Sequence, residues 1–193
     1  AISPELKTAM REETELTFNY ILQQNRPLTE FIDAPYTFLN EPLAKLYGIG
    51  GVTGPAMRKV ALTDRKRGGI LTQASVLTVT SNPTRTSPVK RGKFILENIL
   101  NTPPPPPPPL ISALSEAKED FKGLTMRQRM EQHRKDPACN GCHMQMDPLG
   151  LSLENFNGIG VWRQQDDGAD IDSSGVLPGG RSFKGPAELR AIL

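Results

Sequence analysis

The residues best suited to chemistry lie in one segment of five, Cys139-Asn140-Gly141-Cys142-His143. It holds both cysteines of the chain and one of its two histidines. The pattern C-x-x-C-H is the covalent attachment signature of c-type haem. Two thiols three positions apart can each bond one vinyl group of the same porphyrin, and the histidine that follows directly can bind the iron as its proximal ligand. We therefore expect one haem c held by Cys139, Cys142 and His143.

Two other kinds of site could use the same residues. A redox-active cysteine pair of the thioredoxin type belongs in a β–α–β unit, and no such pattern surrounds residue 139. A zinc site could combine Cys139 and Cys142 with His133 and His143. A histidine adjacent to a ligating cysteine is poorly placed to bind the same tetrahedral ion, so haem is the favoured interpretation and zinc is the alternative.

The second axial ligand of such an iron must come from upstream of the motif. Met146, the last methionine of the chain, follows His143 by three residues, which span at most about 10 Å and cannot pass around a porphyrin edge. His133 is the first candidate for the distal ligand, because it is the only other histidine. It also shares a predicted helix face with Met126 and Met130.

Several alternatives to a distal His133 remain open. Its imidazole could instead cap the end of a helix or bond a haem propionate. Four upstream methionines are further candidates for the distal ligand, although each also fits ordinary core packing: Met10, Met57, Met126 and Met130. An open, five-coordinate iron is the last alternative.

The propionates of a haem need cationic or hydroxyl partners. The loop from Asn82 to Arg91 offers both at the start of a predicted helix, which is a favourable place for an anion. Arg85 is our first choice within it, and a solvated basic surface is the simpler interpretation. Trp162, with Phe156 nearby in sequence, could pack on a haem or belong to an ordinary core.

The elements that must position these residues are mainly helical. Apolar periodicity, caps and breakers predict helices at residues 3–25, 28–34, 36–47, 88–100, 125–135 and from 186 to the end. Residues 57–62 are predicted to be a short strand, and residues 69–80 fit a helix or a strand. Residues 80–88 are predicted to be a polar loop, and residues 147–183 loops with a short hairpin.

Seven consecutive prolines, Pro103–Pro109, divide the chain. Such a run must adopt polyproline II, and its simplest role is a stiff strap about 22 Å long. We therefore expect an N-terminal helical region over residues 1–102, the strap, and a haem c-binding region over residues 110–185. Residues 186–193 would begin a following domain that is truncated here.

Composition narrows the classes of function. The chain has 193 residues, enough for one large domain or two small ones. Its formal net charge of +2 argues against a dedicated nucleic-acid or membrane-surface protein. No apolar run is long enough to span a membrane, and the N-terminus lacks a signal-peptide pattern. We expect the sequence to be a piece of a longer protein.

Long segments of the chain resemble a planctomycete-type family of multi-domain c-type cytochromes, whose domains are described as being of unknown function. The similar segments are TSNPTRTSPVKRG at residues 80–92, the proline run, C-x-x-C-H with the following MDPLG at residues 146–150, and residues 36–48. The resemblance implies a cell-envelope protein with haem c and further domains on both sides. It also implies that a histidine like His133 commonly precedes the haem motif. The resemblance implies no catalytic activity.

These observations together predict a mainly α-helical, cytochrome c-like module with long loops, a polyproline strap and minor β structure. With two strong axial ligands its iron would serve one-electron transfer, with a redox partner protein or neighbouring domains of the same chain as partners. Attachment of haem c implies a periplasm-like compartment. The alternatives are a peroxidase- or oxidase-like haem enzyme with an open distal site, and a haem-bearing interaction module.

Overall fold

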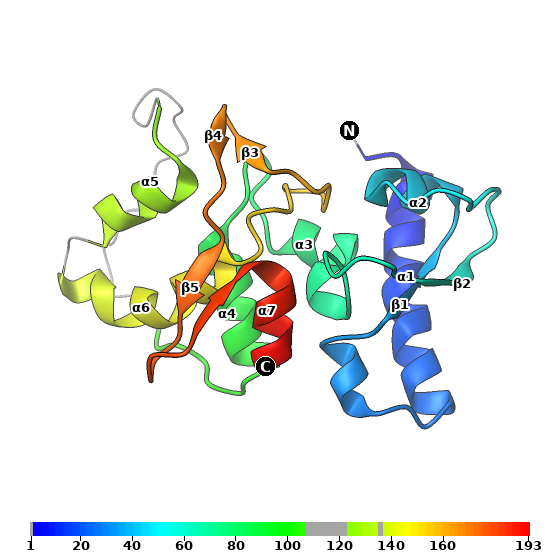
Figure 1. The fold of residues 1–193 in the computed structure, drawn as a ribbon, viewed down its shortest axis with the longest axis horizontal. Helices are drawn as coiled ribbons and strands as arrows, with labels where there is room; N and C mark the ends of the chain where they lie inside the picture. Colours follow the sequence, from blue (N-terminus) through cyan, green and yellow to red (C-terminus); the bar gives the residue numbers. More distant parts are fainter. Residues whose placement is uncertain (1, 107–122, 135–136) are drawn as a thin grey trace. The chain divides into compact units, whose positions relative to one another are not determined.

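A computed structural model describes residues 2–106, 123–134 and 137–193 of the chain, and the side chains of His133 and residues 137–139 lie outside this description. The described residues form seven α-helices and three small two-stranded antiparallel sheets, which confirms the mainly helical prediction. They divide into two compact units (Figure 1). Unit 1 comprises residues 1–79, 156–162 and 186–193, and unit 2 comprises residues 80–155 and 163–185.

Unit 1 is built on the long helix α1, Pro4–Gln23, which Ser3 caps by accepting a hydrogen bond from the Leu6 amide. The strands β1, Tyr36–Leu39, and β2, Arg58–Ala61, pair antiparallel beside it. The remaining elements are a 3₁₀ turn at Leu28–Phe31, helix α2 at Glu41–Tyr47, a 3₁₀ turn at Ile70–Thr72, and the helices α3, Ala74–Val79, and α7, Gly185–Ile192.

The predicted helix over residues 36–47 is wrong in its first half. Tyr36–Leu39 forms a strand, because its aromatic and β-branched side chains suit a half-buried sheet and β2 is available to pair with it. The helix begins only after Asn40, whose side chain caps it by accepting from the Leu43 amide at 3.2 Å. Gly48 ends it in the left-handed conformation, with φ of 70°.

The helix predicted over residues 28–34 is only a 3₁₀ turn at Leu28–Phe31. Three other predictions for unit 1 are confirmed, and one open question is resolved. The helix over residues 3–25 is α1, and the strand within residues 57–62 is β2. Residues 69–80, which fitted either helix or strand, are a 3₁₀ turn followed by α3. The predicted final helix is α7, and it is held within unit 1 because the buried Arg190 guanidinium donates to Asp33 Oδ1 at 3.0 Å.

The apolar core of unit 1 lies between α1, α2 and the β1 strand. Its buried members are small or aliphatic: Ala9, Met10, Leu39, Leu43, Ala44, Val52 and Ala74. Met57 is partly buried against the same core. Burial of apolar side chains such as these favours folding of the unit.

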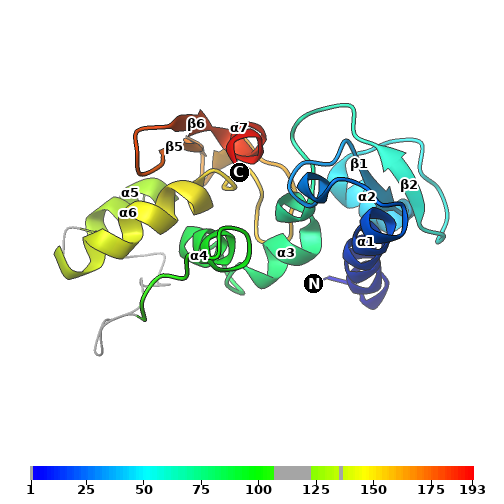
Figure 2. The same cartoon turned by 90° about the horizontal axis from the view of Figure 1, so that it is seen from below.

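Unit 2 contains three helices, α4 at Pro88–Asn98, α5 at Met126–His133 and α6 at Pro137–Leu151, and both α4 and α5 pack on α6 (Figures 1 and 2). Thr125 and Gln128 make the predicted capping box at the start of α5. Two hairpins follow, one formed by β3, Gln165–Asp166, and β4, Ala169–Asp170, and the other by β5, Ser174–Val176, and β6, Ser182–Lys184.

Three predictions for unit 2 are corrected or left open. Loops were expected from Asp147 onward, but α6 continues to Leu151 even though Pro148 lies inside it and cannot donate a helical hydrogen bond. Residues 165–184 form two hairpins where one was expected. Of the polyproline run, Pro103–Pro106 form neither helix nor strand, and the rest lies outside the described residues. Within the described part of the chain, no helix has the length and apolarity needed to cross a bilayer.

Candidate haem-attachment site

The C-x-x-C-H motif lies entirely within α6. Residues three and four positions apart in an α-helix lie on the same face, so positions 139, 142 and 143 share one face of this helix. Pro137 begins the helix, a position where its missing N–H costs nothing. The sequence thus ends α5 before this proline and starts a new helix at it, which presents the three motif positions together.

The imidazole of His143 is held by a carboxylate one helical turn further on. Its Nδ1 lies 2.9 Å from Oδ1 of Asp147. Only 1% of the Asp147 side chain and 15% of the His143 side chain are exposed to solvent. Arg134, which follows α5, forms an ion pair with the other oxygen of this carboxylate, with 3.6 Å between Nε and Oδ2.

This arrangement is one that metal-binding histidines commonly have. Metal-binding histidines usually donate the N–H of one ring nitrogen to a carboxylate or carbonyl, which leaves the lone pair of the other nitrogen for the metal. Asp147 is placed to accept from Nδ1 of His143, and Cys142 has a free, partly exposed thiol. The described side chains of the motif therefore fit a covalently attached haem.

The zinc alternative is untested by these residues. Among the side chains that the structure describes, no three His, Cys, Asp or Glu residues converge as ligands of one ion. The side chains of Cys139 and His133, which the zinc alternative needs, lie outside the description.

The candidate distal ligands fall into two groups. Met126 and Met130 are buried with Leu151 in one cluster, against which Val89 packs, so both fill the core between α5, α6 and α4. Position 133 follows Met126 by seven residues and Met130 by three, which places it on the same face of α5. Met10 and Met57 belong to the core of unit 1.

The basic loop before α4 is only partly what the sequence predicted. Arg85 is half-buried and its Nη1 donates to the carbonyl of Thr86 at 3.0 Å, and its proposed role toward a propionate stays a prediction. Arg91, expected on the same basic surface, is instead fully buried and faces Glu154. Trp162 is half-buried and packs edge-to-face on the buried Phe156 in unit 1, and its role toward a haem stays a prediction.

Glu154 is a buried carboxylate of unit 2 that pairs with two arginines, Arg91 and Arg163. Its Oε1 lies 3.5 Å from Nη1 of Arg91, and its Oε2 accepts hydrogen bonds from Thr86 at 2.8 Å and from Arg163 at 3.1 Å. Burial raises the pKa of the Glu154 carboxyl, and the charges of Arg91 and Arg163 oppose that shift. Burial also lowers the pKa of Arg91 to about 10.

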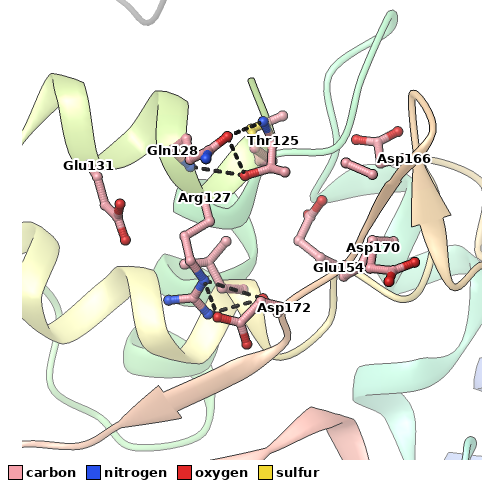
Figure 3. Close-up of a pocket in the computed structure, with 12 residues that line it drawn as sticks. Thr125, Arg127, Gln128, Glu131, Glu154, Asp166, Asp170 and Asp172 are labelled. Atoms are coloured by element: carbon pink, nitrogen blue, oxygen red, sulfur yellow. Dashed lines mark hydrogen bonds and ion pairs between the residues drawn. The ribbon is translucent and has the colours of Figure 1, made fainter. Parts of the chain in front are cut away.

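A pocket of about 350 Å³ opens beside the start of α5 (Figure 3). Five carboxylate side chains line it: Glu131, Glu154, Asp166, Asp170 and Asp172. Arg127 crosses its edge and pairs with Asp172 at 3.0 Å, between Nε and Oδ2. Of the residues predicted to hold haem, Met126, a candidate distal ligand, lines this pocket, and no described side chain of the C-x-x-C-H motif does.

Sequence reasoning missed Asp147 and Arg134. Asp147 lies four residues after His143, a spacing that brings two side chains together on a helix. That signal was lost because the sequence predicted loops from Asp147 onward. Arg134 carried no local signal, since its contact with Asp147 joins the end of α5 to the middle of α6.

Comparisons with known proteins agree with the resemblance seen in the sequence. Residues 1–49 match the family PSD4, described as a protein of unknown function (DUF1592). No curated protein and no solved structure gave a significant match. Residues 67–166 match the family PSCyt3, described as a protein of unknown function (DUF1588), and this match covers more than half of the chain. The chain therefore belongs to the PSCyt3 family.

Proposed function

We propose that this chain is a c-type cytochrome module that carries one haem covalently bound to Cys139 and Cys142, with His143 as the proximal ligand. The observation that carries the proposal is the shared helix face of these three positions, together with the carboxylate of Asp147 at 2.9 Å from the His143 ring. The letters Cyt in the family's name are consistent with it.

The residues of α6 would each have a defined task. The two thiols would fix the porphyrin to one side of the helix, and the rigid helix would hold them at a constant spacing. The carboxylate of Asp147 would keep the imidazole of His143 in one orientation and one tautomer. Met126, Met130 and Leu151 would keep water from the α5–α6 interface, because all three are buried there.

A bound haem would supply a one-electron carrier, which takes an electron from a reduced partner and passes it to an oxidised one. We favour electron transfer over catalysis because the sequence offers His133 as a second axial ligand. The partner would be a redox protein or a neighbouring domain of the same polypeptide. Since haem c is attached outside the cytoplasm, the module would work in the periplasm or cell envelope.

Expression with the machinery that attaches haem c tests the proposal. The purified chain should keep its haem after denaturation, and its mass should increase by one haem. The pyridine haemochrome spectrum should be that of a haem with two thioether bonds. The matched control is a chain with Cys139→Ala and Cys142→Ala, which should bind no haem covalently. Asp147 and Arg134 are not substituted in this control, so only the two thiols are tested.

A wild-type chain that acquires no haem under these conditions would overturn the proposal and revive the zinc alternative. Carbon monoxide separates the two haem functions. A ferrous spectrum that carbon monoxide leaves unchanged supports electron transfer with two axial ligands. Ready binding would instead support the enzyme alternative, in which the distal side of the iron is open.

A further inference from the structure

We infer that Asp147 and Arg134 are positioning residues that set the reduction potential of the iron through His143, and that they act in opposite directions. The inference rests on the proposed function, since it needs the iron that His143 would bind. It assigns roles to two residues outside the C-x-x-C-H motif, from their contacts alone.

The contact between Asp147 and His143 is short and sheltered from water. The 2.9 Å separation between Oδ1 and Nδ1 is that of a hydrogen bond to a charged acceptor. Only 1% of the carboxylate side chain is exposed, so water does not compete with the imidazole for Oδ1. Both residues lie on the same helix four positions apart, and the helix backbone therefore fixes the geometry of the pair.

Such a carboxylate must change how strongly the histidine donates electrons. When a carboxylate accepts the Nδ1 hydrogen, the imidazole becomes a more basic ligand through its other nitrogen. A more basic ligand stabilises the oxidised, more positive iron relative to the reduced one. The negative charge of Asp147 favours the oxidised iron as well, because the low-dielectric interior screens it weakly. Asp147 should therefore lower the reduction potential.

Arg134 weakens this effect. Its Nε lies 3.6 Å from Oδ2 of Asp147, which is an ion pair beyond hydrogen-bond geometry. Oδ2 accepts no hydrogen bond from any residue that the structure describes. The positive charge of Arg134 draws electron density away from the oxygen that faces His143 and partly cancels the field of the carboxylate at the iron. Arg134 should therefore raise the reduction potential.

Redox titration of the haem-loaded chain tests both assignments. Asp147→Asn keeps the size of the side chain and removes its charge, and should increase the equilibrium constant for reduction about tenfold, a shift of about 59 mV for one electron. Arg134→Gln should decrease that constant about threefold, a smaller effect because 24% of the Arg134 side chain is exposed and screened by solvent.

Matched controls remove the same charges elsewhere in unit 2. Glu131→Gln changes an exposed carboxylate on α5, and Arg181→Gln changes an exposed guanidinium between β5 and β6. Both should leave the potential within the error of wild type. A general loss of structure would not move the potential in two opposite directions, so the sign of each shift separates a positioning role from a merely structural one.

The outcomes are distinguishable. If the wild-type chain acquires no haem, the proposed function and this inference fail together. If it does, and Asp147→Asn or Arg134→Gln has the wild-type potential or shifts it in the other direction, the inference alone is overturned. If Asp147→Asn does not accumulate as a folded protein, Arg134→Gln tests the inference alone. A lower reduction potential in that variant supports the inference, and an unchanged or higher one overturns it.

Discussion

Gly92 of α4 lies directly against the backbone of Met146 in α6, so closely that a methyl group on its Cα would collide with the Met146 carbonyl oxygen. The reverse contact also exists, because a methyl group on Gly150 of α6 would collide with the carbonyl oxygen of Pro88. The two helices therefore pack backbone to backbone at two points. This packing fixes the helix that carries the C-x-x-C-H motif.

Gly92→Ala and Gly150→Ala should each destabilise unit 2 by about 3 kcal/mol, the upper end of the usual cost of overpacking, since no side-chain rotation can relieve a clash with backbone. Urea unfolding measures the loss. Gly141→Ala is the matched control, because it lies in α6 with no atom within 4 Å of the added methyl group. It should be neutral or slightly stabilising. Equal losses in all three variants would disprove the close packing of α4 and α6.

Removal of Arg91 should leave Glu154 without its fully buried counter-charge. The Arg91 guanidinium also donates to the carbonyl of Leu153 at 2.8 Å, so a second buried acceptor would lose its donor. We expect Arg91→Met to lower the free energy of unfolding by about 3–5 kcal/mol. Lys93→Met removes the same charge from the exposed side of α4 and should cost at most about 1 kcal/mol. A smaller loss in Arg91→Met than in Lys93→Met would contradict the buried network.

Glu13 of α1 should make the stability of unit 1 fall as the pH rises. Burial raises the pKa of its carboxyl to about 7, although hydrogen bonds from Thr37 and Tyr47 and the charge of Arg67 oppose the shift. Between about pH 4.5 and pH 7 the unfolded chain loses this proton and the folded chain keeps it. By linkage the folded state should lose about 3 kcal/mol across that interval.

Glu13→Gln should abolish this part of the pH dependence, because the amide does not ionise. The measurement is the free energy of unfolding of the variant minus that of wild type, followed from pH 4 to pH 8. That difference should grow in favour of the variant as the pH rises. Glu15→Gln, an exposed change on the same helix, is the control and should give a flat difference. A flat difference for Glu13→Gln would show that its carboxyl ionises normally.

The sequence predicted the elements whose ends carry their own signals. Ser3 and Thr125 cap helices through their side chains, and both helices begin where expected. The helix predicted at Tyr36–Leu39 was wrong because four residues carry too little local signal to distinguish a strand from a helix. This segment is a strand because it pairs with β2, which begins more than twenty positions after β1 begins.

The candidate site, like the fold, was predictable only where the sequence carries a local signal. C-x-x-C-H identifies its three motif positions by spacing alone. The burial of Arg91 was not predictable, since its sequence neighbours Lys90 and Lys93 read as one basic surface and only the packing of α4 on α6 separates them. The role of Asp147 depended on recognising that α6 continues through Pro148.

The identity of the distal ligand gives the last prediction. If His133 binds the iron, then His133→Ala should convert a low-spin absorption spectrum of the haem-loaded chain to a high-spin one and allow carbon monoxide to bind. Met130→Leu is the control, because Met130 lies buried on the same face of α5 and leucine keeps its apolar volume. It should leave the spectrum low-spin. An unchanged spectrum in His133→Ala would reject His133 as the distal ligand. A high-spin spectrum in Met130→Leu would instead identify Met130 as the distal ligand.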